Sequence, residues 1–186
     1  MDKSTPPNAL ALFREEQRAL RSLLADARPP AGAKDIPLLD NDPLMQSVLP
    51  ELRRRLLRYC RLEEDFLQAP LITVEPPQAV ADARVRCDII REMLELLEVL
   101  HGRTSKQNEY RSAFTALADH ALLHFDATQA TLFPLAHERR LDLAALGEQM
   151  RQVPQEPADD VPAADRVADG RLDIGTADGH TPTPTH

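Results

Sequence analysis

Hydrophobic residues recur at steps of three and four along five segments of this chain, and this spacing predicts five α-helices. Most prolines lie outside these segments, at the two termini and in residues 29–50, 70–77 and 154–183. Proline lacks a backbone N–H and disfavours helix interiors, so these clusters are expected to be connections. The predicted helices cover residues 7–27, 44–68, 78–100, 105–131 and 141–152.

Local signals indicate where these helices begin and end. Thr5 and Asn8 are candidate N-caps of the first helix, because their side chains accept hydrogen bonds from unpaired backbone N–H groups. Gly102 is a candidate C-cap of the third helix. Pro50 is expected either to kink the second helix or to lie in its first turn. The fourth helix is expected to end before the Leu-Phe-Pro sequence at residues 132–134.

Each of the four long helices carries polar or ionisable residues on its apolar stripe. A polar group buried among apolar neighbours costs free energy unless it is hydrogen-bonded, paired or bound to a metal. These inward positions are therefore the candidates for chemistry. They are Gln17, Cys60, Glu64, Cys87, Arg91, His124 and Thr128, and His120 shares the face of His124 one turn earlier.

Composition favours helix and excludes several classes of function. The chain has 186 residues, 42% of them hydrophobic, with no Trp and only 6 Gly. We expect one domain at 8–153, a flexible N-terminus at 1–7 and a disordered acidic tail at 154–186. The formal net charge of −8 argues against a nucleic-acid partner, because a phosphate-binding surface needs a basic surplus.

The same sequence predicts a cytoplasmic location. No apolar stretch approaches the ~18 residues of a membrane span, so no membrane partner is expected. The first residues contain no hydrophobic signal segment. Two cysteines in a chain of this length do not make a disulfide framework, and we expect both to be thiols.

Four long helices predict an up-down-up-down bundle, and here the chain resembles the hemerythrin-like, or HHE cation-binding, family over about residues 8–152. His124 followed by Leu132-Phe-Pro134 is similar to the family's fourth helix, and Leu141 to Met150 is similar to its final short helix. In the second helix, Cys60-Arg-Leu-Glu-Glu64 stands where the family has His-x-x-x-Glu. The remaining ligand positions of the family are occupied here by Gln17, Cys87 and Thr128.

This resemblance implies a bundle that, in typical members, holds two non-haem irons through about five histidines and bridging carboxylates. Such proteins bind oxygen, sense oxygen or nitric oxide, or handle iron. Only Glu64 and His124 match the family's ligands in this chain. Two ligands do not hold a di-iron centre, so the resemblance implies a degenerate site and not an ordinary oxygen carrier.

Three interpretations of the inward residues are open. In the first, Cys60, Glu64, Cys87 and His124 hold one zinc or iron ion in a structural or sensing role. The residues around that ion, or replacing it, would be Gln17, Arg91, His120 and Thr128. In the second, the bundle is metal-free, Arg91 pairs with Glu64, and the protein binds an unknown protein partner.

The third interpretation is a thiol redox switch in which Cys60 and Cys87 form a disulfide on oxidation. Their Cα atoms would then have to lie within ~7 Å of each other. The sequence shows neither a Gly-rich phosphate loop nor an activated nucleophile, so we do not expect an enzyme.

Overall fold

A computed structural model describes residues 8–27, 43–72, 77–101 and 107–154, and all the regular structure in these ranges is helical. The predicted all-α class is therefore confirmed for this part of the chain. The predictions for residues 1–7, for residues 155–186, and for Thr5 and Gly102 as caps lie outside the described residues. The helices are α1 (Ala9–Asp26), α2 (Pro43–Glu63), the π-helical turn η2 (Glu64–Gln68), α3 (Ala69–Leu71), α4 (Gln78–Leu100), α5 (Gln107–Glu138) and α6 (Leu143–Gln152).

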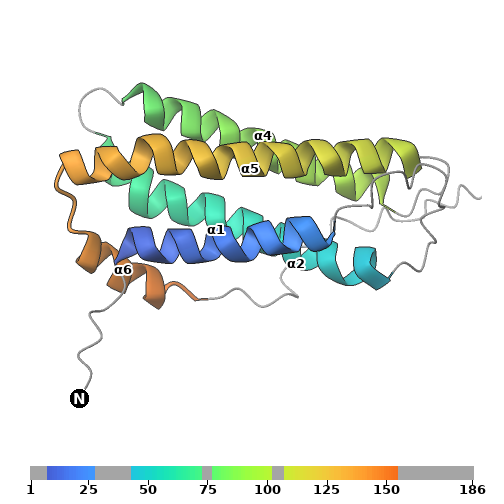
Figure 1. Ribbon diagram of the computed structural model, residues 1–186, viewed down its shortest axis with the longest axis horizontal. Coiled ribbons are helices and arrows are strands. Elements are labelled where there is room, and N and C mark those ends of the chain that lie inside the picture. Colours follow the sequence, from blue (N-terminus) through green and yellow to red (C-terminus); the bar gives the residue numbers. More distant parts are fainter. Residues whose placement is uncertain (1–7, 28–42, 73–76, 102–106, 155–186) are drawn as a thin grey trace, which may run out of the picture.

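The four long helices lie side by side, and the chain runs in opposite directions along successive ones (Figure 1). α1 contacts α2 and α5, and α4 contacts the same two helices. The short α6 packs against α1 at the end where α1 begins (Figure 1). This arrangement turns the apolar stripes of α1, α2, α4 and α5 towards one shared core.

The core consists of the stripes that the periodicity predicts, with one exception in α2 described below. The predicted apolar stripes of α1, α4 and α5 are buried, whereas the predicted inward positions of Arg91 in α4 and His120 in α5 are only half-buried. The largest fully buried side chains are aromatic: Tyr59, Phe13, Phe114 and Phe125. The α4 positions are Val80, Ala83, Cys87, Ile90, Leu94 and Leu97.

The side chains of an asparagine and an aspartate cap the N-termini of two helices. The Asn8 side chain accepts a hydrogen bond from the backbone N–H of Ala11 at 3.0 Å, which confirms Asn8 as the N-cap of α1. The Asp142 side chain accepts from the N–H of Ala145 at 3.0 Å and caps α6 in the same way. Each cap pairs an N–H group that the helix itself leaves without a partner.

One prediction about proline is wrong, and one of the two alternatives for another proline does not hold. α5 continues through Pro134 to Glu138, so the Leu-Phe-Pro sequence does not end the helix. Proline forfeits one helical hydrogen bond there, but Leu132 and Phe133 just before it and Ala136 just after it stay buried, and their burial outweighs the loss. Pro50 likewise lies inside a helix, because α2 begins seven residues earlier, and the first-turn alternative does not hold.

The helix α5 ends at a left-handed residue. Arg140 has a φ of 53°, and the N–H of Leu141 donates to the carbonyl of Ala136 at 3.1 Å. This pattern closes a helix C-terminus by pairing its last carbonyls. The chain then turns directly into α6.

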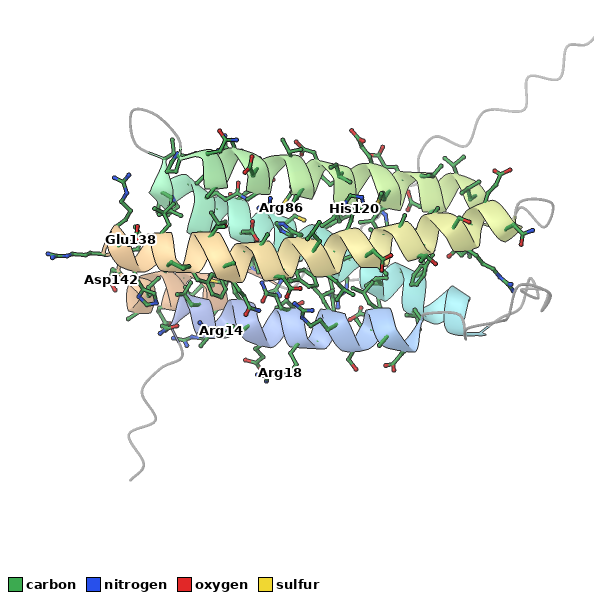
Figure 2. The ribbon with its side chains drawn as sticks, turned by 45° about the horizontal axis from the view of Figure 1, so that its top comes forward. Arg14, Arg18, Arg86, His120, Glu138 and Asp142 are labelled. Carbon is green, nitrogen blue, oxygen red and sulfur yellow. The ribbon has the colours of Figure 1, made fainter. Side chains whose placement is uncertain are left out.

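The outer surface of the described helices is mostly polar, with charged side chains such as Arg18 and Glu138 extending outwards (Figure 2). None of these helices is both long enough and apolar enough to cross a membrane. The exposed large hydrophobic residues in the described part are Val85, Leu96, Val99 and Leu123.

Candidate metal centre

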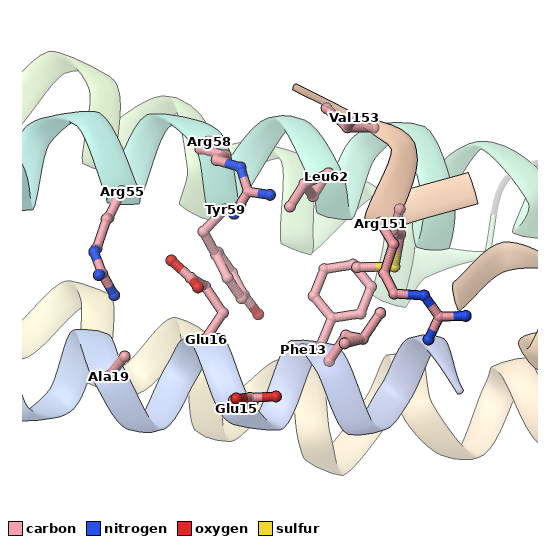
Figure 3. A pocket seen from close by; sticks show the side chains of 12 residues that line it. Phe13, Glu15, Glu16, Ala19, Arg55, Arg58, Tyr59, Leu62, Arg151 and Val153 are labelled. Carbon is pink, nitrogen blue, oxygen red and sulfur yellow. The ribbon is translucent and has the colours of Figure 1, made fainter. Parts of the chain in front are cut away.

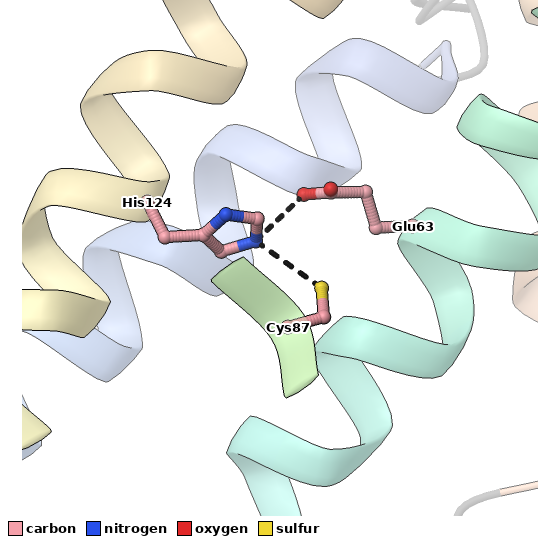
Figure 4. A group of neighbouring side chains, drawn as sticks. All are labelled: Glu63, Cys87 and His124. Atoms are coloured by element: carbon pink, nitrogen blue, oxygen red, sulfur yellow. Dashed lines mark hydrogen bonds and ion pairs between the residues drawn. The ribbon is translucent and has the colours of Figure 1, made fainter. Parts of the chain in front are cut away.

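Three ionisable side chains from three different helices meet in the core. Glu63 comes from α2, Cys87 from α4 and His124 from α5, and all three are fully buried. His124 Nε2 lies 3.1 Å from Glu63 Oε2 and 3.6 Å from Cys87 Sγ (Figure 4). One oxygen, one sulfur and one nitrogen atom therefore all lie within 4.8 Å of one another.

Two of the three separations, nitrogen to sulfur and nitrogen to oxygen, are close to the edges of a tetrahedral metal site. Zinc binds imidazole nitrogen at about 2.0–2.1 Å and thiolate sulfur at about 2.3 Å, which places the two ligand atoms about 3.6 Å apart. The corresponding nitrogen–oxygen edge is about 3.3 Å. The measured distances are 3.6 Å for Cys87 and 3.1 Å for Glu63. A set of one imidazole, one thiolate and one carboxylate suits zinc or iron.

The buried carboxylate is Glu63, and the predicted inward position of Glu64 is wrong. The Glu64 side chain is 32% exposed and forms an ion pair of 2.6 Å with Arg91, which is also 32% exposed. The Arg91–Glu64 contact predicted for a metal-free bundle is thus present, but at the edge of the core. It is the neighbouring Glu63 that reaches His124.

Helical geometry explains the change from Glu64 to Glu63. Glu63 follows the buried Leu56 by seven residues, so its direction differs from that of Leu56 by only ~20°. Glu64 follows by eight residues and points ~80° away. The spacing from Cys60 alone, three or four residues, could not separate the two. The seven-residue separation from Leu56 along the sequence is the signal that identifies Glu63.

Burial and hydrogen bonding shift the pKa values of Glu63 and His124 in opposite directions. Burial alone would raise the pKa of Glu63, but contacts with His124, Gln68 and Thr128 outweigh it and lower that pKa. Burial alone would lower the pKa of His124, but its contacts with Cys87 and Glu63 raise it to about 9. In the metal-free protein at neutral pH, Glu63 and His124 therefore form a buried ion pair.

Two neutral side chains hold the Glu63 carboxylate in place. Gln68 Nε2 donates to Oε1 at 2.9 Å, and Thr128 Oγ1 donates to Oε2 at 3.0 Å. Gln68 follows Glu63 by five residues, a spacing that the π-helical turn η2 brings onto one face. Thr128 was predicted as a neighbour of the site, whereas Gln68 was not, because an α-helical period gives no signal for a π-turn.

Cys60 lies next to this group. It is fully buried, and its thiol is a hydrogen-bond partner of Cys87. The bond to Cys60 and burial together raise the pKa of Cys87 above its ordinary value. Both cysteines are free thiols. Cys60 is thus a buried neighbour of Cys87, but it is not a member of the Glu63–Cys87–His124 group, whose ligand atoms all lie within 4.8 Å of one another. The structure therefore brings together Cys87 and His124 of the four predicted ligands, with Glu63 in place of Glu64 and without Cys60.

Gln17 and Tyr59 extend the polar group towards α1. Gln17 Nε2 donates to the Tyr59 hydroxyl at 2.6 Å, and Gln17 Oε1 accepts from Gln129 at 2.5 Å. Burial and the Glu63 carboxylate raise the pKa of Tyr59 well above its ordinary value, and its ring packs edge-on against His124. Tyr59 was not predicted as a site residue, although its place seven residues after the buried Leu52 indicates an inward position.

Two other observations qualify the environment of His124. Its Nδ1 atom is buried without a hydrogen-bond partner, and so is Oε1 of Gln68. Unpaired buried polar atoms cost free energy and are more readily explained at a functional site than in an inert core.

His120 is half-buried on α5 (Figure 2) and is not a member of the buried Glu63–Cys87–His124 group.

Comparisons with known proteins do not assign a family. The chain matches no protein-family model, no curated protein and no solved structure. The relation to the hemerythrin-like family therefore rests on the sequence resemblance alone.

Thiol reactivity tests the burial of the two cysteines. In the folded, metal-free protein, Cys60 and Cys87 are expected to react with a disulfide reagent at least ~100-fold more slowly than after unfolding in urea. Stopped-flow absorbance of the released chromophore measures both rates. As a control, Leu123→Cys introduces a thiol at a position that is 59% exposed, and this thiol should react fast. Two fast thiols in the folded wild type would contradict the buried arrangement.

Proposed function

We propose that this protein is a hemerythrin-like four-helix bundle of up-down-up-down topology that holds a single zinc or iron ion in place of a di-iron pair. The observation that carries the proposal is the meeting of Glu63, Cys87 and His124 from three helices at distances that fit a tetrahedral site. The alternating direction of the four long helices supports the topology (Figure 1).

In this proposal His124 binds the ion through Nε2, Cys87 through Sγ and Glu63 through a carboxylate oxygen. Cys60, a buried neighbour of Cys87 that lies outside this group, would have to move towards the ion to supply the fourth ligand. Gln68 and Thr128 orient the carboxylate, as neighbouring hydrogen-bonding residues do in many metal sites. Bound metal would supply the positive charge that neutralises the anionic ligands and would link α2, α4 and α5.

The role that we propose is regulatory or sensing and not enzymatic. The three ligands are fully buried, and four protein ligands would fill a tetrahedral coordination shell. Such a closed site stabilises a fold or reports the presence of its ion, whereas a catalytic site keeps one position open. We also propose a cytoplasmic location, which agrees with two free thiols.

A metal-free bundle that binds a protein partner is the second candidate. The observation that favours it is the Glu63–His124 ion pair, because both carboxylate oxygens already accept hydrogen bonds. In this metal-free bundle, the neighbouring thiols of Cys60 and Cys87 could also act as a redox switch by forming a disulfide on oxidation. In such a bundle, with or without the disulfide, the charges of Glu63 and His124 would balance each other without a metal ion.

Metal content separates these candidates. Protein purified from cells supplied with zinc and iron is expected to contain about one ion per chain by elemental analysis. Cys87→Ser, His124→Ala and Glu63→Gln should each lose it, whereas Glu64→Gln should keep it. Cobalt(II) substituted for zinc would give a thiolate-to-metal absorption band that Cys87→Ser abolishes.

The other outcomes have definite meanings. Two irons per chain would show that a di-iron centre forms despite the missing histidines. No metal in a folded, helical wild type would reject the metal centre and favour the partner-binding bundle. Equal loss of metal in Glu64→Gln and Glu63→Gln would contradict the assignment of Glu63 as the ligand.

A further inference from the structure

A cavity of about 330 Å³ lies between α1, α2 and α6 (Figure 3). Its volume falls within the range of small-molecule sites. Apolar side chains line part of it and offer a surface for an apolar group. These side chains are Leu12, Phe13, Leu62, Met150 and Val153.

Two side chains of opposite charge face this cavity from opposite sides. Arg58 extends from α2 and Glu16 from α1 into the space between the helices (Figure 3). The structure shows no hydrogen bond or ion pair between these two side chains, and Nε of Arg58 is buried without a hydrogen-bond partner. The buried Nε is out of reach of a ligand, but Arg58 lines the cavity and has no carboxylate partner among the residues that the structure describes, so the terminal nitrogens of its guanidinium group favour an anionic acceptor.

The other arginines of the cavity are already engaged. Arg55 donates to Glu51 at 2.6 Å, and Arg151 forms an ion pair with Glu148. Glu15 adds a second carboxylate on the α1 side. The α1 side of the cavity is therefore negative, and Arg58 supplies the positive charge on the α2 side.

We propose that this cavity binds a small zwitterion with an apolar side chain, of the α-amino acid class. The ligand carboxylate would bond to Arg58, its ammonium group to Glu16, and its side chain would pack on Phe13 and Leu62. A simple anion would face two glutamates, and a simple cation would face Arg58. A molecule that carries both charges satisfies both sides of the cavity.

Tyr59 provides a way to detect binding. It lines the cavity and is one of only two tyrosines in a chain without tryptophan. A ligand that changes its surroundings should alter tyrosine emission. This inference does not depend on the metal centre, because none of the proposed metal ligands lines the cavity.

L-Leucine is the probe, titrated into the full chain with calorimetry and tyrosine emission as readouts. We expect saturable binding that weakens by at least about tenfold in Arg58→Gln and in Glu16→Gln, the loss of one charge-assisted hydrogen bond. Arg18→Gln, an exposed change on α1, should bind like the wild type. N-Acetyl-L-leucine and L-leucinamide, which each lack one charge, should bind at least about tenfold more weakly than leucine.

Several results would overturn the proposal. Absence of leucine binding to the folded wild type at millimolar concentration would reject it. Unchanged binding in Arg58→Gln would place the site elsewhere. Equal binding of leucine and N-acetyl-L-leucine would reject recognition of a zwitterion. Circular dichroism of each variant shows whether the fold is intact, and Met150→Phe, which narrows the cavity without changing its charge, should weaken binding independently.

Discussion

Replacing Glu63 by alanine is expected to destabilise the metal-free protein by about 3 kcal/mol, the lower end of the range for removing one partner of a buried ion pair. The change leaves His124 buried without its anion and deprives Gln68 and Thr128 of their acceptor. The imidazole can lose its proton, and this limits the loss. Urea denaturation in the presence of a chelator, followed by circular dichroism, measures the free energy of unfolding.

Glu64→Ala is the matched control, since it removes the adjacent carboxylate. The Arg91–Glu64 pair is one-third exposed on both sides, and exposed pairs contribute about 0–1 kcal/mol. The difference between the two variants is therefore expected to be at least about 2 kcal/mol. If Glu64→Ala were the more damaging change, Glu64 would be the inward carboxylate, and the register of α2 described here would be wrong.

The stability of the metal-free protein is expected to fall by about 3 kcal/mol as pH rises from about 6 to about 9, because each pKa unit corresponds to 1.36 kcal/mol. His124 has a pKa of about 9 in the folded protein and an ordinary value of 6.5. The folded state thus binds this proton more tightly than the unfolded state. The contribution of His124 to the free energy of unfolding is complete below its ordinary pKa, and it is lost as the pH rises through the pKa of His124 in the folded protein.

At acidic pH, the stability of the metal-free protein changes with pH in the opposite direction. The pKa of Glu63 is lowered from its ordinary value of 4.5, so its contribution is present above that pH and is lost as pH falls further. Maximum stability is therefore expected between about pH 5 and about pH 6.5. Urea denaturation at a series of pH values, with chelator present, provides the profile.

His124→Gln tests the origin of the alkaline loss. This variant keeps a polar side chain but cannot titrate, so its stability should be nearly constant between about pH 6 and about pH 9. Cys87, whose pKa is raised above its ordinary value of 9.0, begins to contribute only near the upper end of this window, where the thiol of the unfolded state ionises. A slope in His124→Gln equal to that of the wild type would show that another group causes the loss.

The sequence by itself determined the number and approximate position of the long helices and most of the faces that they bury. The prediction for residues 78–100 coincides with α4, and Asn8 caps α1 as predicted. These features are local: hydrophobic period and capping chemistry act within a few residues of one another. For the same reason the inward positions of Gln17, Cys60, Cys87, His124 and Thr128 could be read directly from spacing.

Only the tertiary structure decided which of these side chains meet. Periodicity gives the direction of a residue around its helix but not its height relative to a neighbouring helix. The first interpretation placed His124 and Cys87 in one site, but only the structure shows that they lie at one level. The seven-residue step from Leu56 already favours Glu63 over Glu64, but Gln68 joins the group through a π-turn that an α-helical period does not indicate. Pro134 remains helical because burial of its neighbours outweighs one missing hydrogen bond, a balance that is settled in the core and not in the local sequence.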